Sequence, residues 1–178
     1  YIEIFKDDRF YEALKNTLFF IAGYLPIVMI LSMGIALLLN SKVKGVNGFR
    51  GLFFLPVITS WVAVSMIWKG LLNPEFGVIN SIIEAFGGNG PAWLQNPTFV
   101  IPAIIMVSVW KDVGFLSIIF LGGLQGISQE YYEAAQIDSA NKWQQFRRIT
   151  LPLVSPTTFY ALIITIINSF QVFDQIWI

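Results

Sequence analysis

The sequence contains no cysteine and no histidine among its 178 residues. Without cysteine the chain has no disulfide and no thiolate nucleophile, and without histidine it has neither a Ser-His-Asp triad nor the usual zinc ligands. Charged residues are also scarce, at 12%, where globular chains carry about 25%. Carboxylates remain as possible catalysts, but the other common catalytic groups and metal ligands are missing. We therefore expect no catalytic residue and no metal site.

Apolar residues, by contrast, are abundant. Hydrophobic side chains make up 56% of the chain, and the formal net charge is zero. A soluble protein of this size would leave much of that apolar surface in water, so the surplus predicts a lipid environment or a partner. The neutral balance gives no indication of a nucleic-acid partner.

Four apolar stretches are long enough to cross a bilayer, whose core of about 30 Å needs roughly 20 helical residues. They cover about residues 18–39, 51–68, 99–124 and 157–178. The runs are continuous and lack the short alternation of a membrane barrel. We therefore predict an all-α fold, a polytopic membrane helix bundle. The chain opens without Met and stops inside an apolar run, so we expect a fragment lacking sequence at both ends.

Lys and Arg in the short loops predict the orientation of the bundle. The loops at residues 40–50 and 125–156 are rich in these cations and lie on one side, because two spans separate them. Most acids belong to the other side, at residues 1–15 and 70–98. The positive-inside rule then places the two basic loops in the cytoplasm.

The outer segment includes apolar residues from Val78 to Phe86 at helical spacing. This pattern predicts a short helix at the membrane surface. Trp68 and Trp93 fit the aromatic belt at the outer interface.

The cytoplasmic segment 129–152 predicts two short helices. The first ends near Ile137, Asp138 or Ser139 caps the second, and Pro152 stops it. The small side chains of Ala134 and Ala135 make a smooth surface that another protein can approach. From the residues alone, a docking element and a plain connecting loop both remain open.

This segment also carries a resemblance to a known family. The pattern Glu133-Ala134-Ala135, Asp138, Ile149 and Leu151-Pro152 resembles the EAA loop of binding-protein-dependent ABC permeases. Ser139 stands where that family has Gly, which puts the geometry of the turn in doubt. The wider chain is similar to the sugar-permease branch, of the maltose and glycerol-phosphate type. The matching features are Trp110-Lys111, Gly114-Phe115, Leu121 to Gln125 and the lead-in Arg9-Phe10 with Leu14 to Phe20.

The resemblance implies a six-span subunit of an ATP-driven importer in the bacterial inner membrane, of which four spans are present here. It implies three partners: a second, different permease, a cytoplasmic ATPase dimer and an extracytoplasmic solute-binding protein. The sequence has no Gly-rich phosphate loop of the G-x-x-x-x-G-K-[ST] form, so ATP belongs to the partner ATPase and we expect no cofactor on this chain. The implied ATPase-coupling residues are Glu133, Ala134, Ala135, Asp138, Ser139, Leu151 and Pro152.

Ionisable groups within membrane spans are expensive and often mark a transport path. Lys111 and Asp112 lie inside the third span, and Gly114 offers a local helix break. The pair either neutralises itself and packs the helices, or lines a path or gate.

The fourth span places Asn168, Gln171 and Asp174 within one helical arc. Amides and a carboxylate suit a hydroxyl-rich ligand, and Trp110 offers an aromatic surface for a sugar ring. Interhelical hydrogen bonding is the alternative for this arc. The tentative substrate path comprises Asn168, Gln171, Asp174, Trp110 and Lys111.

Two other function classes remain as alternatives to an importer of a sugar or related polyol or glycerol-phosphate solute. An ion- or proton-coupled carrier needs a connected series of ionisable residues across the bilayer. A membrane enzyme needs its carboxylates, such as Glu130, Glu133 and Asp138, joined by a nucleophile or a metal cluster. The sequence does not identify the solute.

Overall fold

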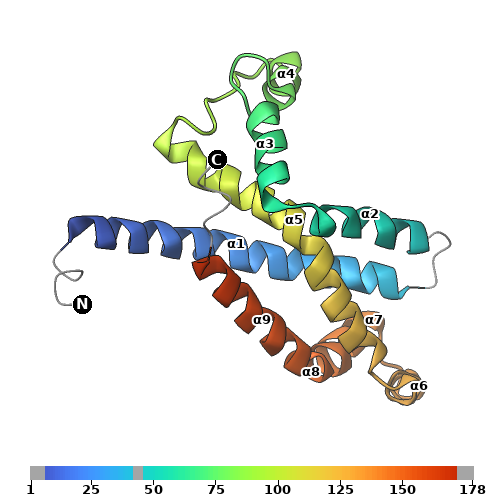
Figure 1. The fold of residues 1–178 in the computed structure, drawn as a ribbon. Helices are drawn as coiled ribbons and strands as arrows, with labels where there is room; N and C mark the ends of the chain where they lie inside the picture. The colour runs from blue at the N-terminus through green and yellow to red at the C-terminus, as the bar shows by residue number, and fades with distance from the viewer. Residues whose placement is uncertain (1–6, 42–45, 172–178) are drawn as a thin grey trace.

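The computed structural model describes residues 7–41 and 46–171, and all regular structure within those ranges is helical (Figure 1). The predicted all-α fold class is confirmed. The helices are α1 Asp8–Asn40, α2 Val46–Ile58, α3 Trp61–Leu71, α4 Val78–Ala85, α5 Pro97–Gln125, α6 Gln129–Ile137, α7 Lys142–Gln145, the π-helical turn η2 Phe146–Thr150, α8 Leu151–Leu153 and α9 Ser155–Phe170.

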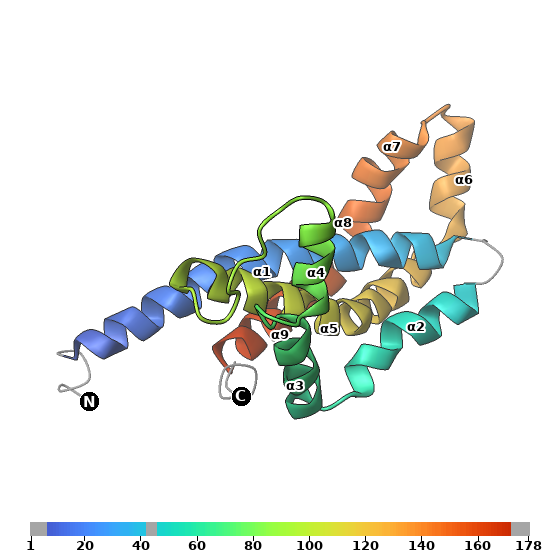
Figure 2. The same cartoon turned by 90° about the horizontal axis from the view of Figure 1, so that it is seen from above.

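The core forms where α1 crosses α5. Both helices run in the same direction, while α2 and α9 run back in the opposite direction (Figures 1 and 2). Fully buried side chains from α1, α5 and α9 fill the crossing, among them Val28, Phe120 and Ala161. A buried hydrogen bond of 3.2 Å from the hydroxyl of Ser32 to the carbonyl of Val113 adds a polar tie between α1 and α5.

Within the described residues, α1 and α5 are long and apolar enough to cross a membrane. Residues 142–153 and 155–170 form a third candidate span if this pair, bent by 62°, is taken as one. The range 18–39 expected from the sequence lies inside α1, and 99–124 lies inside α5. Helix α9 covers the described part of the range 157–178, whose residues 172–178 lie outside the described residues.

The expectation of one continuous helix over residues 51–68 is wrong, because the chain breaks between Ile58 and Trp61. Pro56, near the end of α2, has no N–H to donate, and prolines end or kink helices for that reason. Helix α3 then starts afresh, with the hydroxyl of Ser60 accepting a 3.3 Å hydrogen bond from the amide of Ala63. A hydropathy window averages over Thr59 and Ser60, the two residues between α2 and α3, and therefore misses the break.

Helices α3 and α4 and the loop before α5 form a separate lobe, at the top of Figure 1. Its centre is the side chain of Asn80, 2% exposed, which donates to the carbonyls of Pro91 and Pro74 and accepts a 2.7 Å hydrogen bond from the indole of Trp93. The helix expected from Val78 to Phe86 is observed as α4. Val78, Ile82 and Phe86 lie exposed at spacings of four residues along it, as expected of a helix at a membrane surface.

The helix ends that flank the two basic loops lie at one end of the molecule. The end of α1, the start of α2 and helix α6 gather at the right in both orthogonal views, while α1 begins at the far left (Figures 1 and 2). The arrangement agrees with the topology expected from the charges; the side of the membrane stays a prediction.

Candidate functional site

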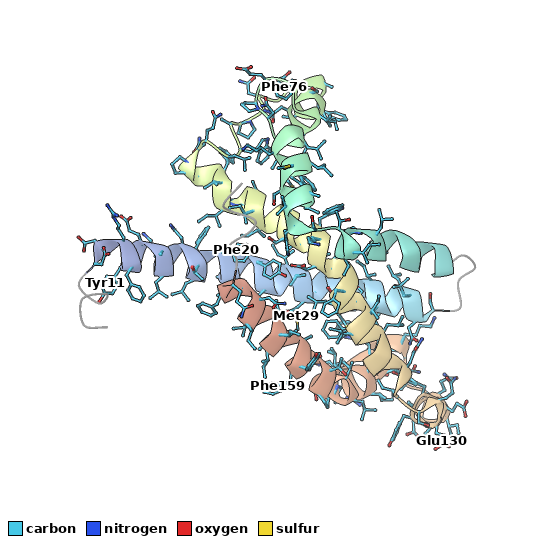
Figure 3. All side chains as sticks on the ribbon, viewed as in Figure 1. Tyr11, Phe20, Met29, Phe76, Glu130 and Phe159 are labelled. Atoms are coloured by element: carbon cyan, nitrogen blue, oxygen red, sulfur yellow. The ribbon has the colours of Figure 1, made fainter. Side chains whose placement is uncertain are left out.

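The segment expected to couple to an ATPase folds as a helical hairpin. Helix α6 begins after Ser128, whose hydroxyl accepts a 3.3 Å hydrogen bond from the amide of Glu130. The chain then turns, and η2 returns beside α6, where the hydroxyls of Tyr132 and Thr150 are 3.0 Å apart. Figure 3 shows Glu130 at the tip of the molecule formed by α6, far from Phe20 and Met29 on α1.

The turn after α6 has the geometry of a Schellman motif. The amide of Ala140 donates to the carbonyl of Ala135 at 2.9 Å, and the amide of Ser139 donates to the carbonyl of Gln136 at 3.0 Å. Ser139 has φ of 57° and is the one non-glycine residue with positive φ in the described chain. Gly favours this conformation because it has no Cβ. The backbone thus keeps the conformation suited to the Gly of the resembling family, although Ser occupies the position.

The second helix of the hairpin starts later than expected. Its cap is Asn141, not Asp138 or Ser139, and Asn141 forms a reciprocal capping box with Gln144 through two 2.9 Å hydrogen bonds. Asn141 supplies the cap because Ser139 takes the left-handed conformation that ends α6, whereas a helix cap needs an extended one.

Pro152 does not end the helical run either. The chain passes from α7 through the π-helical turn η2 into α8, and the bend falls after Leu153. In η2 the amide of Leu151 reaches back to the carbonyl of Phe146, five residues earlier. A π-turn widens the helix, which accommodates a residue that lacks an N–H donor.

The hairpin presents its signature residues to the outside. Glu133 and Ala134 are exposed and Ala135 is half-buried. Beside them Ile137 is 85% exposed and Trp143 is 67% exposed. Tyr131, Leu151 and Leu153 of the hairpin are exposed as well. Several large apolar side chains exposed on one projecting element are typical of a protein contact surface.

Lys111 of α5 is buried, at 5% exposure. Its ammonium donates to the carbonyls of Pro56 at 3.0 Å and Val57 at 3.4 Å near the end of α2, and to that of Thr59 at 2.6 Å just after it. It also lies 5.0 Å from the ring centroid of Trp61 at the start of α3. This geometry favours the packing alternative for Lys111 over a place on an open path.

Asp112 points to a different helix. Its carboxylate accepts a 2.7 Å hydrogen bond from the hydroxyl of Tyr24 on α1. Consecutive helical residues are about 100° apart around the axis, so Lys111 and Asp112 can tie α5 to two different neighbours. The two charges also attract each other electrostatically, so mutual neutralisation of the pair stays a prediction beside these contacts with other helices. Nothing in the sequence around Tyr24 marks it as the partner.

Gly114 does not break α5, which is continuous from Pro97 to Gln125. A Cβ added at Gly114 would overlap the backbone carbonyl of Phe53 on α2. The glycine therefore permits close approach of two helix backbones. It lies three residues after Lys111, on the same face of α5, so both residues hold α2.

Trp110 is 43% exposed and faces an apolar hollow between α1, α2 and α5. The hollow encloses about 830 Å³ and is lined by Phe19, Ile27, Phe53, Met106 and Trp110 among others. The indole of Trp110 also meets the ring of Trp68 edge-on, with 5.5 Å between centroids. An aromatic surface accessible from a hollow of this size has the geometry to stack on a sugar ring.

The polar arc expected on the fourth span is described only in part. Asn168 and Gln171 are exposed near the end of α9, and Asp174 lies outside the described residues. Within the described residues, no hydrogen bond or ring contact joins Asn168 or Gln171 to Trp110 or Lys111. Their neighbours Ser169 and Phe170 line a second hollow, of about 270 Å³, together with Asn16 and Thr17 of α1. Asn16 and Thr17 lie outside the apolar range 18–39, which is why the sequence did not indicate them.

Comparison with known proteins identifies the family. Residues 32–175 match the family described as the binding-protein-dependent transport system inner membrane component. The chain belongs to this family. The match covers most of the described helices, including the hairpin α6–α8 and both residues of the Lys111–Asp112 pair.

Named relatives are similar over nearly the whole chain. The lactose transport system permease protein LacF of Rhizobium radiobacter is 32% identical over 99% of this chain and 60% of its own length. The trehalose/maltose transport system permease protein MalF of Thermococcus litoralis is 32% identical over 100% of this chain and 60% of its own length. The chain thus spans about three fifths of these proteins. The expected sugar-permease type is confirmed.

A solved structure shares the fold. A chain from a bacterial ABC transporter involved in the import of the acidic polysaccharide alginate superposes with a TM-score of 0.87 and 31% sequence identity. The superposition covers 96% of this chain and 60% of that chain.

Proposed function

We propose that this chain is part of the permease subunit of an ATP-driven importer of a sugar or related polyol or glycerol-phosphate solute. The observation that carries the proposal is the hairpin α6–α8, which presents Glu133, Ala134, Ile137 and Trp143 at one end of the helix bundle. The named relatives, which transport lactose and trehalose or maltose by their printed names, support a carbohydrate as the solute.

The hairpin suits a docking role because of its shape and surface. Helices that project from a bundle can lie in a groove of a partner, with apolar side chains as anchors. Ala134 allows the partner backbone to approach, and Glu133 offers a carboxylate to basic or polar groups of the partner. In the proposed mechanism the partner is a cytoplasmic ATPase dimer. Its ATP-driven closure moves the hairpin and, through the bend after Leu153, helix α9.

We propose two further partners besides the ATPase. A second permease completes the translocation path, and an extracytoplasmic solute-binding protein delivers the solute. Binding proteins are implied by the family description, and one similar structure is an alginate transporter in complex with a periplasmic protein. We place the subunit in a bacterial inner membrane with the hairpin in the cytoplasm.

The carrier alternative needs a connected series of ionisable groups across the bilayer. In the described spans Lys111 donates to backbone carbonyls at the end of α2 and just after it, and Asp112 accepts from Tyr24 of α1. This geometry supports a structural use of both charges, and it gives the carrier alternative no path.

The test uses the full-length subunit assembled with its partners in proteoliposomes. We expect Glu133→Lys to abolish ATP-dependent sugar uptake and solute-stimulated ATP hydrolysis, because it reverses the charge at the docking surface. The matched control is Glu130→Lys, an exposed acid on the same helix but outside the signature. Uptake that persists without ATP and collapses with the ion gradient would instead establish the carrier.

The substrate-path proposal has its own test. Asn168 and Gln171, both exposed on α9, are replaced together by Ala. We expect a higher solute concentration for half-maximal uptake, since lost hydrogen bonds weaken solute binding. Unchanged uptake would assign this arc to contacts between helices. Exposed Gln136 on the hairpin provides the control substitution.

A further inference from the structure

The break between α2 and α3 leaves backbone groups without helical partners. The last carbonyls of a helix have no N–H donor within it, and lipid supplies none. At the start of α3, Ser60 accepts from one free amide. At the end of α2, the amide of Thr59 donates to the carbonyl of Pro56 at 3.3 Å. Another donor to the carbonyls here is Lys111, more than 50 positions away along the chain.

The ammonium of Lys111 suits this position in both geometry and charge. It has three protons, and three carbonyls of residues 56, 57 and 59 lie within 3.4 Å of it. The C-terminal end of a helix carries a partial negative charge, which a cation stabilises. The Trp61 ring, 5.0 Å away, adds a cation–π contact from the first turn of α3. One ammonium therefore holds both sides of the break.

Two further observations make Lys111 the main polar connection at this junction. Gly114, one turn further along α5, lets the backbone of α2 approach closely at Phe53. The hydroxyls of Ser65 and Ser108 are buried without a hydrogen-bond partner in the structure. Ser65 lies one turn after Trp61 on α3, and Ser108 lies about one turn before Lys111 on α5. Because neither hydroxyl makes a hydrogen bond, neither holds the base of α3 in place.

We propose that Lys111 is a positioning residue for transport. Its charged ammonium fixes the break between α2 and α3 at one geometry. The outer lobe built on α3 and α4 then moves as one body with α5 when the transporter changes state. The effect on uptake rests on the proposed function, whereas the effect on geometry does not.

The geometric test measures the distance between α3 and α1. Cysteines that replace exposed Met66 on α3 and exposed Ile30 on α1 are spin-labelled in the full-length subunit, assembled with its partners in lipid. With Lys111 in place we expect a narrow distribution of distances between the two labels. In Lys111→Met the distribution should be at least twice as broad. In Lys111→Arg it should be narrow again, because arginine keeps the charge and the hydrogen-bond donors. Lys15→Met, the same substitution at an exposed lysine of α1, is the control and leaves the distribution narrow.

A chemical rescue separates the role of the ammonium from that of the side chain as packing. Lys111→Ala leaves space beside the three carbonyls, and methylammonium supplies the missing cation. Narrowing of the Lys111→Ala distribution by methylammonium, with no effect on Lys15→Ala, supports the proposal. A distribution that is unchanged in Lys111→Met, or that methylammonium does not narrow in Lys111→Ala, overturns it.

Uptake per assembled transporter completes the test. We expect the maximal rate in Lys111→Met to fall about tenfold, as for loss of hydrogen bonds to a charged group, with the half-saturating solute concentration unchanged. Wild-type uptake in Lys111→Met overturns a role in transport. If the wild-type assembly itself shows no ATP-dependent uptake while the distances behave as expected, the proposed function fails and the geometric role of Lys111 stands.

Discussion

The hydroxyl of Tyr24 donates a 2.7 Å hydrogen bond to the carboxylate of Asp112, and this bond joins the two longest helices of the described chain. Tyr24 is 3% exposed, and its ring stacks on that of Phe20 with 5.1 Å between centroids. A partly buried carboxylate depends on such a donor, because burial without a partner is costly.

Removal of the Tyr24 hydroxyl should therefore destabilise the bundle. We expect Tyr24→Phe to lower stability by about 1–3 kcal/mol, since the ring packing stays and the carboxylate loses its donor. Thermal unfolding in detergent measures the change. In a Tyr24→Phe, Asp112→Leu double variant the loss should be smaller than the sum of the two single changes, because no acceptor is left unpaired. Additive losses would show that the bond contributes little.

Gly114 supports a second prediction, on helix packing. Gly114→Ala should prevent α2 from docking against α5, because the new Cβ overlaps the carbonyl of Phe53. The matched control is Gly122→Ala, on the same helix, where a Cβ meets nothing within 4 Å. We expect the control to be neutral or slightly stabilising, as Ala favours a helix over Gly by about 1 kcal/mol. Equal thermal stability of the two variants would contradict the close approach.

Ser139 supports a third prediction, on the turn of the hairpin. Ser139→Gly should stabilise the turn by about 1 kcal/mol, because positive φ costs a residue with a Cβ about that much. Ser139→Ala keeps a Cβ and serves as the control, with no gain expected. Amide hydrogen exchange of α6 and α7 measures the difference. Slower exchange in both variants would assign the effect to the hydroxyl and not to the backbone conformation.

The sequence predicted the ranges of α1, α5 and α6, but it misplaced a cap and two helix breaks and did not predict the distant contacts. The bounds of α6 were predicted from a short local run of residues, 129 to 137, and they were correct. The break after Ile58 was missed because apolar residues continue on both sides of it. The partners of Lys111 and Asp112 were missed because they lie 52 and 88 residues away. Periodicity reports the face of a residue on its own helix, and it does not report which helix packs against that face.

The same distinction applies to the candidate sites. The signature of the hairpin is contiguous in sequence, and the structure presents it on one projecting element. The tentative substrate path was assembled from two spans, and its members lie in different surroundings: Lys111 is buried, Trp110 faces the apolar hollow and Asn168 is exposed on α9. A shared path between them needs helices beyond those described, or a partner.

The exposed apolar residues of the hairpin give the last prediction. Ile137 is 85% exposed on α6, and burial of an aliphatic side chain of this size contributes about 1.5–3 kcal/mol. If Ile137 docks against the ATPase, Ile137→Ser should weaken binding of the ATPase about tenfold or more, while the thermal stability of the subunit stays unchanged. Titration of the purified ATPase against the subunit in nanodiscs measures the affinity.

Gln136→Ser is the control for that measurement, because Gln136 is an exposed neighbour on the same helix with no comparable apolar area to lose. Trp143→Ser should act like Ile137→Ser, since Trp143 is 67% exposed on the facing arm of the hairpin. Weaker binding in the Ile137 and Trp143 variants, with normal binding in the Gln136 variant, would place both arms in the contact. Equal affinity in all three variants would mean that the ATPase binds elsewhere, and the hairpin would then be a connection between α5 and α9.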